Sequence, residues 1–254
     1  TYPENTGSVT GNNYVGGIFG YGYSDSSSSS ITGAKNSSAV SANAVVGGIC
    51  GWLGNVYLDS CDNAGTTIKA TGYIVEDSKQ NVYVGGYVGR GFYAVNCKNK
   101  VDINYTGNGR YVGGIAGYFD AWGTCTLSGL ENEGNISGKD YVGGIAGYIR
   151  NGERGTLALN NLKNSGKIVG KEDYIGGIVG SVYCYYYYGG SKLVATYPEN
   201  TGSVTGNNYV GGIFGYGYSD DSSSSINGVK VTGMVRGNEN YGIIIGYVKN
   251  IKVQ

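Results

Sequence analysis

The sequence predicts an all-β fold of the solenoid type, in which short strands stack coil upon coil. Three observations lead to this prediction. A seven-residue motif, Tyr-Val-Gly-Gly-Ile-x-Gly, recurs along the 254 residues. Apolar residues alternate over short runs that end at glycines, as in strands, and no stretch has helical periodicity. Because a sequence period of about 20 to 50 residues indicates a repeat architecture, we expect about eight coils of roughly 30 residues, forming one domain over residues 1–254.

The glycine motif, called the heptad below, marks the period. Its copies are Tyr14–Gly20, Val45–Gly51, Tyr83–Gly89, Tyr111–Gly117, Tyr141–Gly147, Tyr174–Gly180 and Tyr209–Gly215. A decayed eighth copy runs from Asn240 to Gly246, with Ile243 in place of the second glycine. Successive copies stand 28 to 38 residues apart. A phosphate-binding loop needs a single strand-to-helix context, so this regular recurrence argues against one.

The two central glycines of the heptad are predicted to form a corner. Strict strand alternation would place Val15 and Ile18 on opposite faces. Both can point inward if the glycine pair between them forms a bulge or turn, because glycine adopts backbone conformations that other residues avoid. The variable residue after isoleucine would then lie at a less constrained edge. In the seven copies this residue is Phe19, Cys50, Val88, Ala116, Ala146, Val179 and Phe214.

A second block, x-x-Asn-x-Gly-x-Val-x-Gly, precedes the heptad and covers Pro3–Gly11 in the first repeat. Its asparagines form a column of Asn5, Asn36, Asn63, Asn99, Asn132, Asn164 and Asn200. Its β-branched residues form another, made of Val9, Val40, Ile68, Ile136, Ile168 and Val204. Stacked identical amides can bond to the coils above and below, as in other stacked-β assemblies. We therefore interpret the asparagines as a structural ladder rather than as a binding site.

A third block, with apolar residues at alternate positions, precedes the asparagine, as in Leu157-x-Leu159-x-x-Leu162. Each repeat is thus expected to hold about three short strands and three corners. Cys61 and Cys97 take the place that Leu162 holds later, so we expect them to pack as small buried hydrophobes. A disulfide between them is an open alternative. Adjacent coils would bring them about 4.8 Å apart, whereas disulfides prefer Cα separations of about 5.5–6 Å.

The composition excludes several classes of function. The 18 basic and 18 acidic residues cancel without a basic cluster, so nothing favours nucleic acid. Histidine is absent, which removes a His-based triad and a His-ligated zinc site. The five cysteines follow no metal spacing, and we expect no metal and no cofactor. No apolar run is long enough to span a membrane. The chain opens inside a repeat without a leader, as a mature or excised segment would.

These blocks resemble the GLUG-motif repeats of bacterial surface proteins, which are named for a Gly-aliphatic-Gly signature. Such repeats occur in the non-catalytic regions of IgA1-protease-type enzymes and in gut-bacterial adhesins. The matching elements are the heptad and the block Cys61-Asp62-Asn63-Ala64-Gly65, and together they cover nearly the whole chain. The resemblance implies a right-handed parallel β-helix that is extracellular or at the cell surface. It carries over no catalytic residue, because the zinc protease centre of that family lies outside the repeats.

The C-terminal part combines a duplication with a divergent coil. Residues 1–33 reappear almost unchanged as residues 196–228, and the segment 196–254 ends in a cap-like coil that departs from the pattern. An exposed apolar solenoid end invites strand pairing. Ordinary decay of the repeat at a boundary is the alternative. The candidates for end-to-end assembly are Tyr241, Ile243, Ile244 and Ile245.

Binding is expected on the variable loops after the heptads, because insertions in solenoids map to one face. Two of these loops carry the serine runs Ser26–Ser30 and Ser222–Ser225. Tyrosine offers a flat apolar ring with a polar tip, which suits sugars and protein partners. A tyrosine stack that only shields the flank is the alternative. The candidate tyrosines are Tyr21, Tyr23, Tyr183, Tyr185, Tyr186, Tyr187, Tyr188, Tyr216 and Tyr218.

The sequence therefore predicts a non-catalytic structural or adhesive module. Its partners would be further copies of itself, or the surface glycans and proteins of a host or a bacterium. A subunit of a self-assembling extracellular filament is the alternative. A β-helical polysaccharide-active enzyme is a third possibility, but such enzymes need clustered acids on one face. The acidic residues of this chain look scattered, with no pair recurring in one column.

Overall fold

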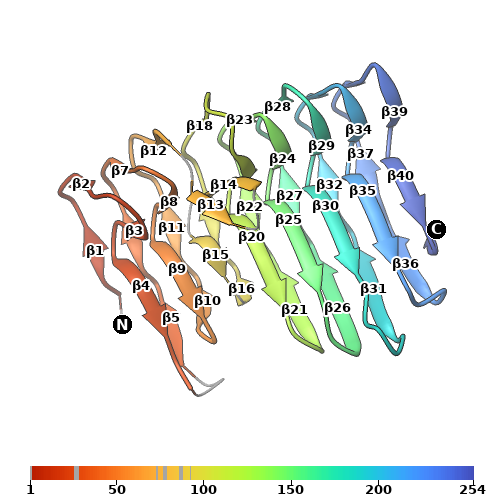
Figure 1. Ribbon diagram of the computed structural model, residues 1–254, viewed down its shortest axis with the longest axis horizontal. Coiled ribbons are helices and arrows are strands. Elements are labelled where there is room, and N and C mark those ends of the chain that lie inside the picture. Colours follow the sequence, from red (N-terminus) through yellow and green to blue (C-terminus); the bar gives the residue numbers. More distant parts are fainter. Residues whose placement is uncertain (1, 26–28, 73, 77–78, 86–87, 92) are drawn as a thin grey trace.

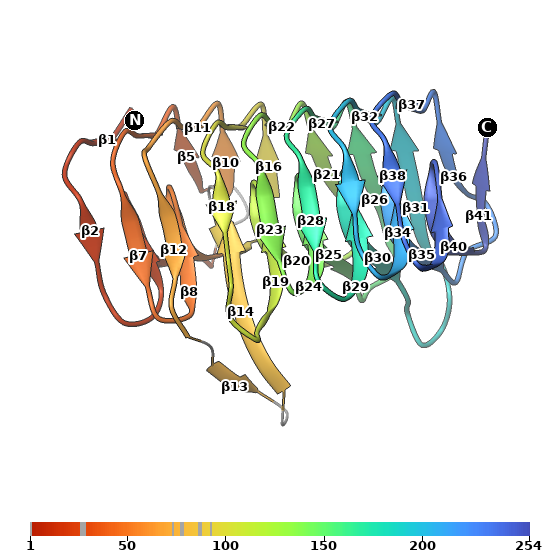
Figure 2. The ribbon, with the colours of Figure 1, turned by 90° about the horizontal axis from the view of Figure 1, so that it is seen from above.

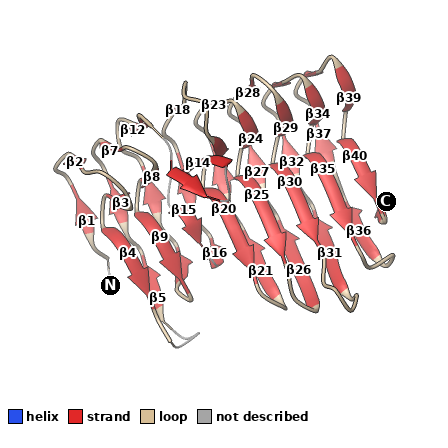
Figure 3. Cartoon of the chain, in the orientation of Figure 1, coloured by secondary structure: helices blue, strands red, loops and turns tan. Residues whose placement is uncertain are grey.

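The computed structural model describes residues 2–25, 29–72, 74–76, 79–85, 88–91 and 93–254. The described residues form strands and loops and no helix (Figure 3). The chain winds into a β-solenoid of about seven turns with roughly 32 residues per turn, and its termini lie at opposite ends (Figure 1). The predicted fold class is confirmed. Each of eight stacked coils adds one strand to each of five parallel sheets, so a coil holds five short strands instead of the expected three.

Sheets I and II contain the asparagine block. Sheet I consists of β1 (Glu4–Asn5), β6 (Lys35–Asn36), β11 (Asp62–Asn63), β17 (Lys98–Asn99), β22 (Glu131–Asn132), β27 (Lys163–Asn164), β32 (Glu199–Asn200) and β37 (Lys230–Val231). Sheet II consists of β2 (Val9–Thr10), β7 (Val40–Ala42), β12 (Ile68–Ala70), β18 (Ile103–Asn104), β23 (Ile136–Gly138), β28 (Ile168–Gly170), β33 (Val204–Thr205) and β38 (Val235–Arg236). The β-branched column of sheet II also includes Ile103 and Val235, which complete the predicted set.

Sheets III and IV flank the glycine corner. Sheet III consists of β3 (Val15–Gly16), β8 (Val45–Gly47), β14 (Lys79–Gly85), β19 (Arg110–Gly113), β24 (Asp140–Gly143), β29 (Asp173–Gly176), β34 (Asn208–Gly211) and β39 (Glu239–Gly242). Sheet IV consists of β4 (Phe19–Tyr23), β9 (Cys50–Gly54), β15 (Val88–Gly91), β20 (Ala116–Ala121), β25 (Ala146–Asn151), β30 (Val179–Cys184), β35 (Phe214–Ser219) and β40 (Ile245–Lys249).

Sheet V carries the leucine block and closes the coil. It consists of β5 (Ser30–Thr32), β10 (Tyr57–Asp59), β16 (Tyr93–Val95), β21 (Cys125–Ser128), β26 (Gly155–Asn160), β31 (Ser191–Thr196), β36 (Ser224–Asn227) and β41 (Ile251–Val253). One extra strand, β13 (Ile74–Glu76), pairs antiparallel with β14. This hairpin projects from the body in Figure 2 and accounts for the longest spacing between heptads.

The heptad turns the corner between sheets III and IV, and its apolar residues point into two different cores. Val46 lies among the buried residues of sheets II and III. Ile49 lies among those of sheets IV and V. The residue after isoleucine is not at a loose edge, as the pattern suggested, because Cys50, Ala146 and Phe214 are fully buried. Ala116 and Val179, which open β20 and β30, are fully buried in the same way.

The variation at that position follows the need to fill a fixed volume. Ala116 precedes the fully buried Phe119, whereas Phe214 precedes Gly217 by the same three residues. Phe119, Ile149, Val182 and Gly217 stand in register. A large residue at one position therefore accompanies a small one at the other, as expected of an interior packed to nearly crystalline density.

The asparagine column divides the interior. Each ladder amide donates from Nδ2 to the Oδ1 of the next, as Asn132 does to Asn164 at 2.7 Å. The same bond joins every successive pair from Asn5 to Asn200 at 2.7–2.9 Å. The ladder reaches from sheet I to the glycine corner, since Asn36 Oδ1 lies 2.7 Å from where a Cβ on Gly17 would be. A fully bonded amide wall thus separates the two apolar clusters at little cost in unsatisfied polar groups.

All five cysteines are buried free thiols, so the possible disulfide between Cys61 and Cys97 is absent. Cys125 pairs in register with Leu157 of the next coil. Burial raises the pKa of Cys125 and of Cys184 to about 12. Thiolates are the reactive form of cysteine, so these two side chains pack as small hydrophobes.

Candidate functional site

The tyrosines of the heptads form a column on the outer face of sheet III. Tyr141 and Tyr174 stack with ring centroids 4.5 Å apart, and Tyr174 and Tyr209 stack at 5.0 Å. Tyr141 has a φ of 51° and Tyr174 a φ of 62°, in the left-handed region that bulky side chains rarely adopt. This local distortion recurs in coil after coil. It lets the tyrosine ring stay outside while the following valine or isoleucine packs inside.

A second column of tyrosines lies beside the first, on sheet IV. Tyr118, Tyr148, Tyr216 and Tyr247 occupy the position one residue after the heptad. Tyr216 and Tyr247 stack at 5.1 Å. The two columns meet edge to face: Tyr148 touches Tyr141 at an interplanar angle of 86°, and Tyr216 touches Tyr209 at 88°. Edge-to-face contact is a favoured aromatic geometry, so the two columns support each other.

Ser181 interrupts the second column. It stands in register between Tyr148 and Tyr216, at the one place in coils 4 to 8 where this column lacks a tyrosine. The interruption forms part of a groove of about 470 Å³, lined by Tyr141, Tyr148, Tyr174, Ser181, Tyr183, Tyr209, Tyr216 and Tyr247. Ser181 is 3% exposed and so lies at the floor of the groove. Tyrosine rings form the walls of the groove on both sides of Ser181.

The structure brings together only some of the tyrosines that the sequence singled out. Tyr183 and Tyr216 both line the groove. Tyr218 stacks on Tyr183 at 4.8 Å, and Tyr185 lies against both of these rings. Tyr21 and Tyr23 lie in coil 1, where both contact Trp52, and they do not line the groove.

The tyrosine-rich loop after β30 stands beside this face. Asp220 holds it, because its two carboxylate oxygens accept hydrogen bonds from the backbone amides of Tyr186 at 2.7 Å and Ser191 at 2.8 Å. Tyr187 and Tyr188 are 79% and 82% exposed, at the tip. Of the two serine runs, Ser222–Ser225 follows β35 in coil 7, whereas Ser26–Ser28 lie outside the described residues.

The heptad tyrosines, Ser181, Tyr148 and Tyr247 are the groove residues that the sequence did not single out. The tyrosines had a signal, since the first residue of nearly every heptad is tyrosine. Strand alternation alone does not say which heptad residue faces solvent, so this signal does not distinguish a surface tyrosine from a structural one. Ser181 could have been found by aligning the residue after each heptad.

A buried acid lies next to the groove. Asp140 pairs with Arg110, whose Nε is 3.4 Å from Asp140 Oδ2. The other oxygen, Oδ1, has no hydrogen-bond partner among the described residues. Burial raises the pKa of Asp140 to about 6, and the nearby Arg110 charge opposes that shift. Burial also raises the pKa of the neighbouring Tyr141, and the Asp140 charge adds to the effect.

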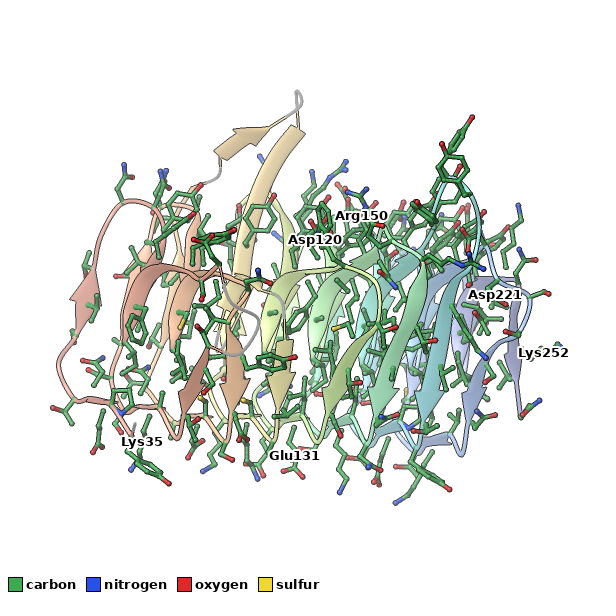
Figure 4. The ribbon with its side chains drawn as sticks, turned by 90° about the horizontal axis from the view of Figure 1, so that it is seen from below. Lys35, Asp120, Glu131, Arg150, Asp221 and Lys252 are labelled. Carbon is green, nitrogen blue, oxygen red and sulfur yellow. The ribbon has the colours of Figure 1, made fainter. Side chains whose placement is uncertain are left out.

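The sequence suggested scattered acidic residues, but the acidic residues of sheet I are ordered. They alternate in sign with lysines from coil to coil in a column of Glu4, Lys35, Asp62, Lys98, Glu131, Lys163, Glu199 and Lys230. Figure 4 shows Lys35 and Glu131 along one edge of the solenoid, with Asp120 and Arg150 along the opposite edge. This column could have been found in the sequence, because each of its residues directly precedes the ladder position of its repeat. Ion pairs within this column include Lys35–Glu4, Lys98–Glu131 and Lys163–Glu131, and such partly exposed pairs each contribute about 0–1 kcal/mol.

The described residues contain no group of three or more His, Cys, Asp or Glu side chains placed to hold a metal ion. Among them, too, there is no helix that could cross a lipid bilayer. The chain matches no protein-family model, no curated protein and no solved structure.

Proposed function

We propose that this solenoid is a non-catalytic adhesive module, extracellular or at a cell surface, that binds carbohydrate chains along its tyrosine face. The observation that carries the proposal is the break in the second tyrosine column at Ser181. Stacked coils lie about 4.8 Å apart, so a ring inserted over Ser181 would take the place of the missing tyrosine between its two neighbours.

The chemistry of the groove favours a sugar. A pyranose ring has apolar faces that pack on aromatic rings and hydroxyl groups that bond to polar tips, and tyrosine supplies both surfaces. Few side chains need to be ordered on binding, because the rings already stack on each other at 4.5–5.1 Å. The rigid parallel coil also presents the groove in a fixed shape. Surface glycans of a host or a bacterium are therefore the partners we propose.

A glycan array followed by calorimetry tests the proposal with the variant Ser181→Tyr. The new ring would complete the column and fill the groove floor, so we expect glycan binding to fall at least about tenfold while the fold stays intact. Tyr187→Ser, at the exposed loop tip outside the groove, is the matched control and should bind normally. Unchanged affinity in Ser181→Tyr would contradict the proposal, as would an array with no bound glycan.

A polysaccharide-active enzyme is the second candidate, and the raised pKa of Asp140 favours it. A carboxyl group that keeps its proton to about pH 6 can act as a general acid. Turnover of a polysaccharide that disappears in Asp140→Asn, with binding retained, would replace the adhesive function by this one.

A further inference from the structure

Two nearly identical coils sit in different environments. Coil 1 (residues 1–33) and coil 7 (residues 196–228) share almost the same sequence, but in the structure only coil 7 packs against another coil on its N-terminal side. Phe214 is fully buried, whereas the corresponding Phe19 is 41% exposed. Val204 is fully buried, whereas the corresponding Val9 is half-buried. The N-terminal face of coil 1 is thus an uncovered copy of a surface that is covered elsewhere in the molecule.

The contacts that cover coil 7 come from coil 6 (residues 160–195), which contains β27. Asn164 Nδ2 donates to Asn200 Oδ1 at 2.8 Å. The backbone amides of Glu199 and Thr201 donate to the carbonyl oxygens of Leu162 and Asn164, both at 2.9 Å. In coil 1 the residues that correspond to Glu199, Asn200 and Thr201 are Glu4, Asn5 and Thr6, identical in type. Coil 1 can therefore repeat each of these contacts.

The opposite end of the solenoid lacks the features that make coil 6 a good neighbour. An added Cβ on the second heptad glycine would overlap the carbonyl oxygen of the equivalent residue in the next coil, and this holds at Gly17, Gly114, Gly144, Gly177 and Gly212. In coil 8 that position is Ile243, which is 71% exposed. The ladder asparagine is also replaced there, by Val231, which pairs in register with Asn200.

A coil stacked on coil 8 in the same geometry would therefore place its backbone against the Ile243 side chain. The alternating charges of sheet I would allow coil 1 of a second copy to stack on coil 8, because Lys230 would lie next to Glu4 and the signs would still alternate. An exposed ion pair contributes too little to displace overlapping backbone atoms. Sterics decide the matter, and the C-terminal end is closed to a coil of this type.

We propose that the N-terminal face of coil 1 is a docking surface for another solenoid coil, one with the edge chemistry of coil 6. That chemistry is an asparagine in the ladder column and a glycine at the second central position of the heptad. Coil 8 of a second copy does not offer such an edge, because Ile243 and Val231 stand at the glycine and asparagine positions there. This interface is separate from the tyrosine groove.

A fusion tests the proposal in the full chain. Residues 160–195 are placed ahead of Thr1, so that the added coil includes the Leu162 carbonyl and Ala195 precedes Thr1 just as it precedes Thr196. Hydrogen–deuterium exchange then follows the amides of Glu4 and Thr6. We expect their exchange to slow by about tenfold or more, since each gains a carbonyl partner in a packed sheet. Sedimentation of the unfused chain should show a monomer.

The matched control is the same fusion with isoleucine at the position of the added coil that corresponds to Gly177. This single change copies the closed edge of coil 8, and Glu4 and Thr6 should exchange as fast as in the unfused chain. Unprotected amides in the first fusion would overturn the proposal. So would equal protection in the control, or concentration-dependent end-to-end oligomers of the unfused chain.

Discussion

The amide of Asn132 lies against Gly114 of the preceding coil, in the space where any larger side chain on that glycine would begin. Asn164 and Gly144 have the same relationship, as do Asn200 and Gly177. The ladder asparagine and the second heptad glycine therefore form one structural unit across adjacent coils. Each buried amide keeps its hydrogen bonds because the glycine leaves room for it.

Asn132→Ala should destabilise the chain by about 3 kcal/mol, because it leaves a donor of Asn99 and the acceptor of Asn164 unpaired in the interior. Urea unfolding followed by circular dichroism would measure the loss. Asn5→Ala is the control, since Asn5 is half-exposed and ends the ladder. Its loss should stay below about 1 kcal/mol. Equal losses at the two sites would argue against a buried ladder.

Large and small residues in sheet IV should be exchangeable in pairs. Ala116→Phe should overpack coil 4 and cost about 1–3 kcal/mol, and Phe119→Gly should leave a cavity and cost about 3–5 kcal/mol. The double variant copies Phe214 and Gly217, so we expect it to be more stable than the sum of the single losses implies, with a coupling of about 2 kcal/mol. Additive losses, measured by thermal unfolding, would contradict the packing relationship.

Asp140 should make stability depend on pH in mildly acid solution. Its pKa is raised by burial from 3.8 to about 6 in the folded chain, so the folded state holds the proton more tightly than the unfolded state. Stability from this group is greatest below about pH 4 and is lost as the pH rises to about 6. A shift of about two units corresponds to at most about 3 kcal/mol.

Asp140→Asn removes the ionisation, so it should raise the melting temperature at pH 7 and flatten the decline between about pH 4 and pH 6. Glu239→Gln, on an exposed carboxylate of the same sheet, is the control and should leave the profile unchanged. A profile for Asp140→Asn that matches the parent chain would show that this carboxyl does not carry the effect.

The closed C-terminal edge should open when its two departures from the repeat are reversed. Val231→Asn with Ile243→Gly restores the ladder asparagine and the corner glycine, and Lys230 is already placed to meet Glu4. We expect this double variant to associate end to end in sedimentation experiments, whereas Val231→Asn alone stays monomeric because Ile243 still blocks the backbone. A monomeric double variant would mean that other residues close this end.

Much of the fold could be predicted because residues that stack on one another in successive coils recur in the sequence at a fixed period. The asparagine column, the β-branched column and the glycine corner were all readable, since identical residues stack in register. The number of strands was underestimated because segments such as Glu4–Asn5 are too short to show alternation. The inward position of Cys50 was missed because the corner shifts the alternation after the two glycines, a shift that depends on backbone geometry.

The candidate groove was predictable only in part. The abundance of tyrosine predicts an aromatic surface, but it does not show that the heptad tyrosines, rather than the loop tyrosines, form the stacked column along that surface. The lack of a tyrosine at position 181 becomes informative only when Tyr148 and Tyr216 are known to flank Ser181 in the neighbouring coils. The raised pKa of Asp140 depends on burial, which its place at a turn-like sequence position did not indicate.

The ladder has one direction throughout. From Asn5 to Asn164, each amide donates to the asparagine of the next coil toward the C-terminal end, and Asn200 accepts the last of these bonds. Aligned hydrogen bonds polarise one another, so the interior carries a lengthwise dipole, with oxygen at the first rung and N–H at the last. Any array that continues this ladder must therefore keep all of its coils pointing the same way, and inverting a single coil would set like partial charges against each other at two buried junctions.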